Sequence, residues 1–145
     1  MSDVPSQPER PQEVADFLHR HPEMRAVDAI FADLSGVIRG KRYPIDELDK
    51  IYTEGLAFPG SAFLLDVVGE SHDPAGLGFS DGDPDYFAKA IPGTLAPVPW
   101  APKPLAQVLL GFVEADGRPY RYEPRNVLAQ VAARLDELKL RPVVA

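Results

Sequence analysis

The sequence contains no cysteine, and this absence excludes several kinds of chemistry. Without thiols, the chain has no disulfide framework, no zinc–thiolate site and no thiol nucleophile. It also lacks an apolar run of the roughly 20 residues that a membrane-spanning helix needs. The first residues, Met-Ser-Asp-Val-Pro, lack the basic and apolar regions of a signal peptide. We therefore expect a cytoplasmic protein without a membrane partner.

Basic charge is also scarce. The 22 acidic residues outnumber the 15 lysines and arginines, which gives a formal net charge of -7. A surface that binds nucleic-acid phosphates needs the opposite sign, so nucleic acid is not an expected partner. Gly76, Gly78 and Gly82 do not have dinucleotide-binding spacing, and no P-loop lysine follows a glycine-rich loop. No serine has the flanking residues of a nucleophile elbow.

Proline, in contrast, is abundant. The chain has 16 prolines in 145 residues, about twice the usual share of ~5%. Proline and glycine together stay below the level of about 25% at which disorder becomes the better prediction. We therefore expect a folded chain with many turns, which forms one domain or one domain and the beginning of another.

Hydrophobic periodicity and turn residues predict short helices and strands in alternation. The predicted elements are a helix from Pro11 to His21, strands at 27–34 and 37–43, a helix from Pro44 to Gly55, strands at 62–68, 105–114 and 118–122, a helix from Pro124, and the beginning of a strand at 141–145. Residues 1–11 are expected to be poorly ordered. A helix followed by half a strand indicates a sequence cut from a longer protein.

An acidic stretch between the predicted strands is the main candidate site. Asp81, Asp83 and Asp85 alternate, and we call these three residues the acidic rim. The prolines around them exclude a helix, so we expect a functional loop that leads into an edge strand. A calcium loop beginning at Asp81 would need glycine at Tyr86 and glutamate at Pro92, so that interpretation fails. The acidic rim either attracts a cation or an amine, or is a solvated turn.

Two further features leave alternatives open. Arg39, Lys41 and Arg42 form a basic cluster, which is either a charged edge strand that resists aggregation or a surface facing an anionic partner or a neighbouring subunit. Trp100 is interpreted as a packed anchor rather than a stacking platform.

Several strings point to a known family when they are taken together and in order. They are Phe31-Ala-Asp33-Leu-Ser-Gly36, Leu65-Asp66-Val-x-Gly69, Asp81-Gly-Asp83-Pro-Asp85, Pro92-Gly-Thr-Leu95, Val98-Pro-Trp100, Glu123-Pro-Arg125 and Pro142-Val-Val-Ala145. This ordered set resembles the N-terminal part of the glutamine synthetase superfamily, nearest the γ-glutamylpolyamine synthetase type. The resemblance covers roughly residues 24–145.

The resemblance implies an α+β fold, with a β-grasp (ubiquitin-like) domain and the beginning of a catalytic domain. Residues 1–23 would form an arm and a short helix, residues 24–122 the β-grasp domain, and residues 123–145 a linker helix and the first catalytic-domain strand. In the family, the metal-binding glutamates begin with a Glu-x-Glu motif directly after the strand that resembles Pro142–Ala145. No catalytic residue and no metal ligand is therefore expected in this chain, which would be inactive alone.

The implied reaction is ATP-dependent ligation of the glutamate γ-carboxylate to an amine, with Mg²⁺ or Mn²⁺ in the complete enzyme. The family forms homo-oligomeric rings in which the β-grasp domain closes a neighbouring subunit's active site, so the expected partner is a catalytic domain. An alternative is a free-standing, non-catalytic β-grasp module that acts in binding or regulation.

One departure from the family bears on the substrate. Ammonia-using members carry Phe-Asp-Gly-Ser-Ser where this chain has Phe58-Pro59-Gly60-Ser61-Ala62, and their aspartate binds ammonium. Pro59 cannot accept a proton or pair with a cation, so a polyamine or monoamine is favoured over ammonia. The resemblance places Pro59, Ser61 and Asp81 on the amine side.

Overall fold

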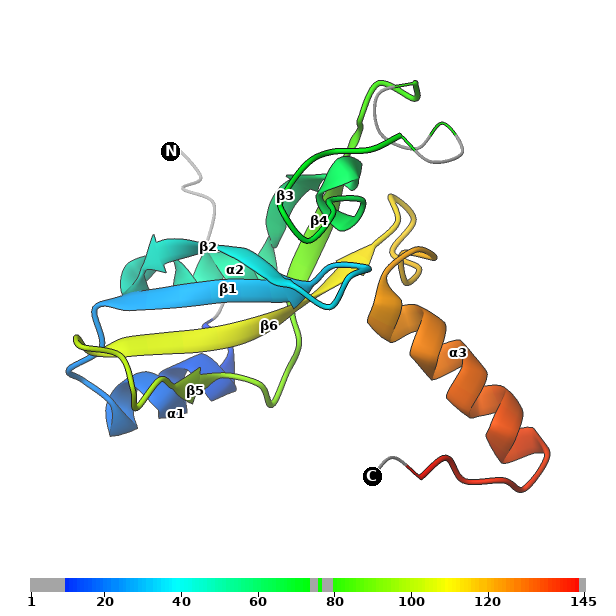
Figure 1. Ribbon diagram of the computed structural model, residues 1–145. Coiled ribbons are helices and arrows are strands. Elements are labelled where there is room, and N and C mark those ends of the chain that lie inside the picture. Colours follow the sequence, from blue (N-terminus) through cyan, green and yellow to red (C-terminus); the bar gives the residue numbers. More distant parts are fainter. Residues whose placement is uncertain (1–9, 74–75, 77–79, 144–145) are drawn as a thin grey trace, which may run out of the picture. The chain divides into compact units, whose positions relative to one another are not determined.

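The computed structural model describes residues 10–73, 76 and 80–143, and it shows a mixed α+β chain (Figure 1). Its elements are α1 (Gln12–Arg20), β1 (Ala26–Ala32), β2 (Ile38–Pro44), the 3-10 helix η1 (Ile45–Glu47), α2 (Leu48–Thr53), β3 (Leu56–Pro59), the 3-10 helix η2 (Gly60–Phe63), β4 (Asp85–Ala90), β5 (Ala96–Pro97), β6 (Leu105–Val113) and α3 (Pro124–Glu137). The predicted helices at Pro11, Pro44 and Pro124 are confirmed, as are the strands at 27–34, 37–43 and 105–114.

The strands pair in the order β2-β1-β6-β4-β3, and β5 pairs with β6 outside this order. β1 runs parallel to β6, with Ala26 opposite Leu105 and Ile30 opposite Leu109. β2 is an edge strand, which agrees with one of the two interpretations of its basic cluster. β4, which follows the acidic rim, lies between β6 and β3. The expected edge strand after the acidic rim is therefore wrong.

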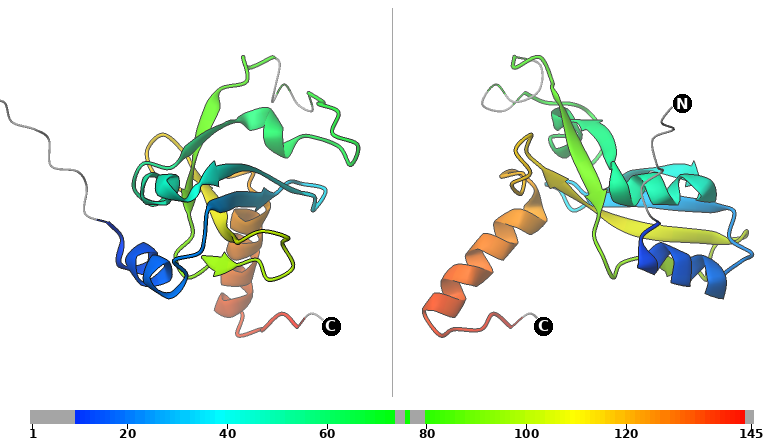
Figure 2. Two further views of the ribbon diagram at one scale, coloured as in Figure 1. Left: turned by 90° about the vertical axis from the view of Figure 1, so that its left-hand side faces the viewer. Right: turned by 180° about the vertical axis from the view of Figure 1, so that it is seen from behind.

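The chain divides into two compact units, which are described separately. Unit 1 combines the described residues of Met1–Ile30, Gly40–Leu56 and Lys89–Leu110. Unit 2 combines Phe31–Arg39, the described residues of Ala57–Ala88, and those of Gly111–Ala145. Figure 2 shows from two further sides how the chain passes through these segments.

Unit 1 has an apolar core to which its helices and strands both contribute. Val14 and Phe17 of α1 are buried, as are Leu48 and Ile51 of α2. Each pair is three residues apart and so occupies one face of its helix. The buried strand residues of this unit include Val27, Ala29, Ala106, Val108 and Leu110.

Gly40 explains how closely β2 approaches β1 in this unit. A Cβ atom at position 40 would lie 2.1 Å from the carbonyl oxygen of Ala29. No side chain fits at that distance, and the φ of 154° at Gly40 lies in a region that L side chains rarely adopt.

Unit 2 has an aromatic core. Phe63 and Phe112 meet edge to face with ring centroids 4.5 Å apart, and Phe31 meets Phe112 in the same way at 4.9 Å. Phe58 and Tyr120 extend this cluster. All five rings are buried, in the offset geometry that aromatic pairs prefer.

Three local predictions fail. Residues 62–68 do not form a strand, because the chain turns through η2 and buries Phe63. Residues 118–122 form no return strand; the turn at Asp116 and Gly117 closes with a single bridge between Val113 and Pro119. Trp100 is 77% exposed, so it is not a packed anchor.

The C-terminal part of unit 2 is solvent-exposed. Within α3 no residue is buried, and its apolar residues Val127, Leu128 and Val131 are exposed, as is Leu138 at its C-terminal end. Residues 141–143 form no strand. The rest of the strand expected there, and residues 1–9 of the expected poorly ordered arm, lie outside the described residues. In the part of the chain that the structure describes, no helix has the length and apolar character needed to cross a membrane.

Candidate functional site

The loop that carries Pro59 and Ser61 is fastened to the acidic rim by three hydrogen bonds. The Gly60 amide donates to the carbonyl oxygen of Pro84 at 3.1 Å. The Ser61 amide donates to Asp83 Oδ1, and the Ser61 hydroxyl donates to Asp83 Oδ2, each at 2.8 Å. Both oxygens of one carboxylate therefore bind the same residue, which fixes the loop against the acidic rim.

The ring of Tyr86 lies beside this loop and explains why position 60 is a glycine. A Cβ atom at Gly60 would lie 2.9 Å from Tyr86 Cε2, which is closer than real Cβ atoms approach. Tyr86 itself packs on Tyr120, with ring centroids 4.2 Å apart. Any side chain at position 60 would therefore have to displace a ring that also packs on Tyr120.

The structure brings Ser61 to Asp83, while Asp81 accepts a hydrogen bond within the neighbouring turn. Asp81 Oδ1 accepts the Asp83 amide at 3.0 Å, and Asp83 has a left-handed φ of 49°. Aspartate tolerates this region better than most residues because its short side chain can bond nearby backbone. Asp81 and Asp85 are exposed and Asp83 is half-buried, so the three carboxylates of the acidic rim are not equivalent.

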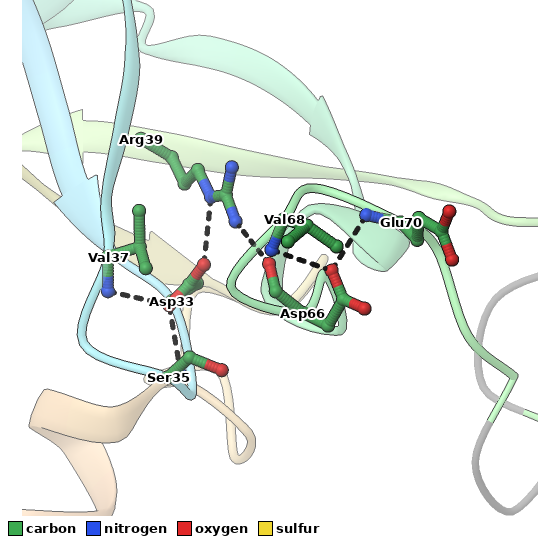
Figure 3. A network of polar contacts seen from close by, with 7 residues as sticks. All are labelled: Asp33, Ser35, Val37, Arg39, Asp66, Val68 and Glu70. Atoms are coloured by element: carbon green, nitrogen blue, oxygen red, sulfur yellow. Dashed lines mark hydrogen bonds and ion pairs between the residues drawn. The ribbon is translucent and has the colours of Figure 1, made fainter.

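A second polar network in unit 2 is built on Asp33 (Figure 3). Asp33 is only 1% exposed. Its Oδ1 accepts the amides of Ser35 and Val37 at 2.9 and 2.8 Å, and its Oδ2 accepts Arg39 Nε at 2.8 Å. The buried carboxylate is thus satisfied by two backbone donors and one guanidinium, as burial of a charge requires.

Arg39 connects this network to a second turn. Its Nη2 donates to the carbonyl oxygen of Asp66 at 2.8 Å. The carboxylate Oδ1 of Asp66 accepts the amides of Val68 and Glu70, each at 2.9 Å (Figure 3). His72 Nε2 lies 3.1 Å from Asp66 Oδ2, and this hydrogen bond, with the Glu70 and Val68 amides, lowers the pKa of Asp66.

Two of the three residues of the basic cluster make such internal pairs. Arg39 belongs to the Asp33 network, and in unit 1 Arg42 makes two parallel bonds to Asp28 at 2.7 and 2.8 Å. With β2 at the edge of the strand order, these pairs favour the charged edge strand over a surface for an anionic partner.

Sequence reasoning named Pro59, Ser61 and Asp81 but missed the residues that organise them. The role of Asp83 could have been suspected from its place in the alternating acidic stretch. Asp66 stood in a quoted motif, but nothing in its spacing signalled its approach to Glu70 and His72.

Comparisons with known proteins agree on one family, although no family model matches the sequence. The chain is 41% identical over 134 residues to γ-glutamylputrescine synthetase PuuA of Escherichia coli (strain K12), which is 92% of this chain and 28% of that protein. It is 34% identical over 118 residues to glutamine synthetase of Pyrococcus horikoshii, which covers 81% of this chain and 23% of that protein. A glutamate–isopropylamine ligase of a Pseudomonas species is 30% identical over 129 residues, covering 86% and 27%.

Solved structures give the same result. A structure described as a GmaS/ADP complex is 27% identical, with a TM-score of 0.64, over 86% of this chain and 26% of that one. A glutamine synthase homologue supports the fold alone, at 22% identity and a TM-score of 0.67, over 79% of this chain and 27% of that one. The sequence spans about a quarter of the length of these relatives. With this similarity across most of its own length, the chain belongs to the glutamine synthetase superfamily.

Proposed function

We propose that this chain is the β-grasp domain of a glutamine synthetase-like ligase that joins the γ-carboxylate of glutamate to an amine. Residues 24–122 would form that domain, residues 1–23 an arm with a short helix, and residues 123–145 the beginning of the catalytic domain. The supporting observation is the 41% identity to a γ-glutamylputrescine synthetase over 92% of this chain. Its relatives also include ligases named for isopropylamine and methylamine.

In this proposal the chain forms the amine side of a neighbouring subunit's active site within a homo-oligomeric ring. Pro59 gives the loop no carboxylate with which to hold ammonium or take its proton. The exposed carboxylates of Asp81 and Asp85 flank Asp83, the residue that binds Ser61 of this loop. They would attract the charged amines of a polyamine, which supports a polyamine or monoamine rather than ammonia as substrate.

Ser61 contributes by position in this scheme. Its amide and hydroxyl are both committed to Asp83, so the hydroxyl holds the loop in place. The backbone of the loop is then fixed, so the side chain at position 59 would meet the substrate in a defined position. The residue at position 59 would therefore influence which amine is selected.

ATP and Mg²⁺ or Mn²⁺ belong to the complete enzyme in this proposal. Among the described residues, one group of three metal-ligating side chains occurs, Asp66, Glu70 and His72. This mixed carboxylate and imidazole set does not fit the glutamate ligands that the resemblance places after Ala145. We therefore derive no phosphoryl-transfer step from this chain, which we propose to be inactive alone and to act in the cytoplasm.

The test is a substitution at position 59 in the complete enzyme. Pro59→Asp should raise kcat/KM for ammonia relative to putrescine, because it supplies the carboxylate that ammonia-using members have. Pro59→Ala is the matched control, since it removes the ring without adding a charge, and it should leave the ratio unchanged. If both variants shift the ratio equally, loop rigidity rather than charge sets the preference, and the proposal fails at this residue.

A further inference from the structure

Asp66, Glu70 and His72 bring three possible metal ligands together in unit 2. Each offers one ligand atom, and these atoms all lie within 4.8 Å of one another. Asp66 Oδ2 and His72 Nε2 are 3.1 Å apart. Two ligands of a tetrahedral zinc ion, each at about 2.0–2.2 Å from the metal, are separated by about 3.3–3.6 Å. That pair is already near the required spacing, and the Glu70 ligand atom lies within 4.8 Å of both.

Backbone hydrogen bonds hold the turn that carries Asp66 and Glu70 in place. The Asp66 amide donates to the Glu70 carbonyl oxygen at 3.0 Å, and the Gly69 amide donates to the Asp66 carbonyl oxygen at 3.0 Å. Arg39 donates to that same carbonyl oxygen, and the buried Asp33 fixes Arg39 (Figure 3). Outer contacts of this kind orient metal ligands and raise metal affinity.

The two oxygens of the Asp66 carboxylate have different partners. Its Oδ1 accepts the amides of Val68 and Glu70, which orients the group and leaves Oδ2 facing His72. Ser71 forms an isolated antiparallel bridge with Leu65. In such an extended segment, alternate residues point to the same side. Glu70 and His72 flank Ser71, and their ligand atoms and that of Asp66 all lie within 4.8 Å of one another.

An ordinary ion pair accounts for only part of this arrangement. It explains the contact between Asp66 and His72, but it does not require a second carboxylate beside them. An imidazole nitrogen with two carboxylate oxygens is a set that suits zinc and similar transition metals, whereas Mg²⁺ and Ca²⁺ prefer oxygen ligands throughout.

We propose that Asp66, Glu70 and His72 form a binding site for a divalent transition-metal ion of the Zn²⁺ type. Three protein ligands leave the fourth tetrahedral position for water or another ligand. The site can be tested on this chain without any ligase assay.

The experiment is a titration of the chain with ZnCl₂ in a non-chelating buffer near pH 7. Calorimetry gives the affinity, and NMR of the histidine rings shows which imidazole binds. We expect the His72 ring signals to shift at one equivalent of Zn²⁺ and to remain shifted in excess Mg²⁺. His72→Gln and Glu70→Gln should each weaken Zn²⁺ binding by at least about tenfold, at the low end of the losses seen even for outer-shell partners.

The chain offers a matched control in its other two histidines, His19 and His21. The double variant His19→Gln/His21→Gln should bind Zn²⁺ as the parent does. The proposal is overturned if this control loses binding while His72→Gln retains it, or if Glu70→Gln binds Zn²⁺ as tightly as the parent. Absence of any His72 shift at millimolar Zn²⁺ overturns it as well. Circular dichroism of each variant establishes that the fold is intact.

Discussion

Replacing Asp33 by asparagine tests whether this buried carboxylate stabilises the turn at Ser35 and Val37 through its bond to Arg39. Asparagine has nearly the same shape, and its oxygen can still accept the amides of Ser35 and Val37. Its NH₂ group, however, would face Arg39 Nε, which lies 2.8 Å from the present carboxylate, so donor would meet donor. The variant therefore removes one charge-assisted bond and leaves the rest of the turn in place.

The expected cost follows from burial. A hydrogen bond to a charged group contributes about 1.5–3 kcal/mol. Since Asp33 is 1% exposed, water cannot replace the lost partner, and we expect a loss of about 2 kcal/mol in the free energy of unfolding. For a chain of this size that lowers the melting temperature by about 4–8 °C. Urea unfolding followed by far-UV circular dichroism measures the change, and hydrogen exchange of the Val37 amide locates it.

Asp28→Asn is the matched control for this prediction. Asp28 makes the same kind of bond to Arg42 at 2.7 Å, but that pair is largely exposed and screened by solvent. The control should move the unfolding midpoint much less than Asp33→Asn does. Equal effects of the two variants, or unchanged exchange at Val37, would refute the view that burial gives the Asp33 network its weight.

Three further predictions concern other parts of unit 2. Gly60→Ala should destabilise the chain by about 1–3 kcal/mol, because its Cβ would lie 2.9 Å from the Tyr86 ring; urea midpoints measure this, and a neutral result would mean that the ring yields freely. Burial raises the pKa of Glu123, so its stabilising contribution is complete below the unfolded-state pKa and is lost as pH rises through the folded-state pKa. Glu123→Gln should flatten the unfolding free energy between pH 4 and 8, and an unchanged slope would contradict this. Leu128 is exposed on α3, so Leu128→Glu should change the free energy of unfolding by less than about 0.5 kcal/mol. The same variant should reduce self-association in sedimentation experiments. A parent chain that is already monomeric would count against this prediction.

Local sequence signals predicted much of the fold. The apolar run at 105–113 identified β6, whose residues alternate between buried and half-buried over most of the strand. Proline at the first helical turn identified α3. The strand predicted at 62–68 failed because its apolar composition concealed a turn, in which Asp66 binds the Val68 and Glu70 amides and Gly69 adopts a φ of 87°. Tertiary packing of Phe63 outweighed local strand propensity there.

The candidate site was less predictable, because its contacts join distant residues. Ser61 and Asp83 are 22 positions apart, and Arg39 reaches Asp66 across 27. No spacing rule links such pairs, so sequence reasoning could name Ser61 and the acidic rim but could not pair them. The β-grasp assignment is a proposal that rests on the family resemblance. So are the roles given to Pro59, Ser61 and Asp81.

The parallel pairing of β1 with β6 has a consequence for how the chain is made. During synthesis, β1 emerges together with its neighbour β2, but the other edge of β1 waits until residues 105–109 leave the ribosome. Contacts between segments so distant in sequence form slowly, and an open strand edge can pair with another chain in the meantime. Translation that pauses before residues 105–113 have left the ribosome should therefore yield nascent chains that need a chaperone, whereas a pause after they have left it should not.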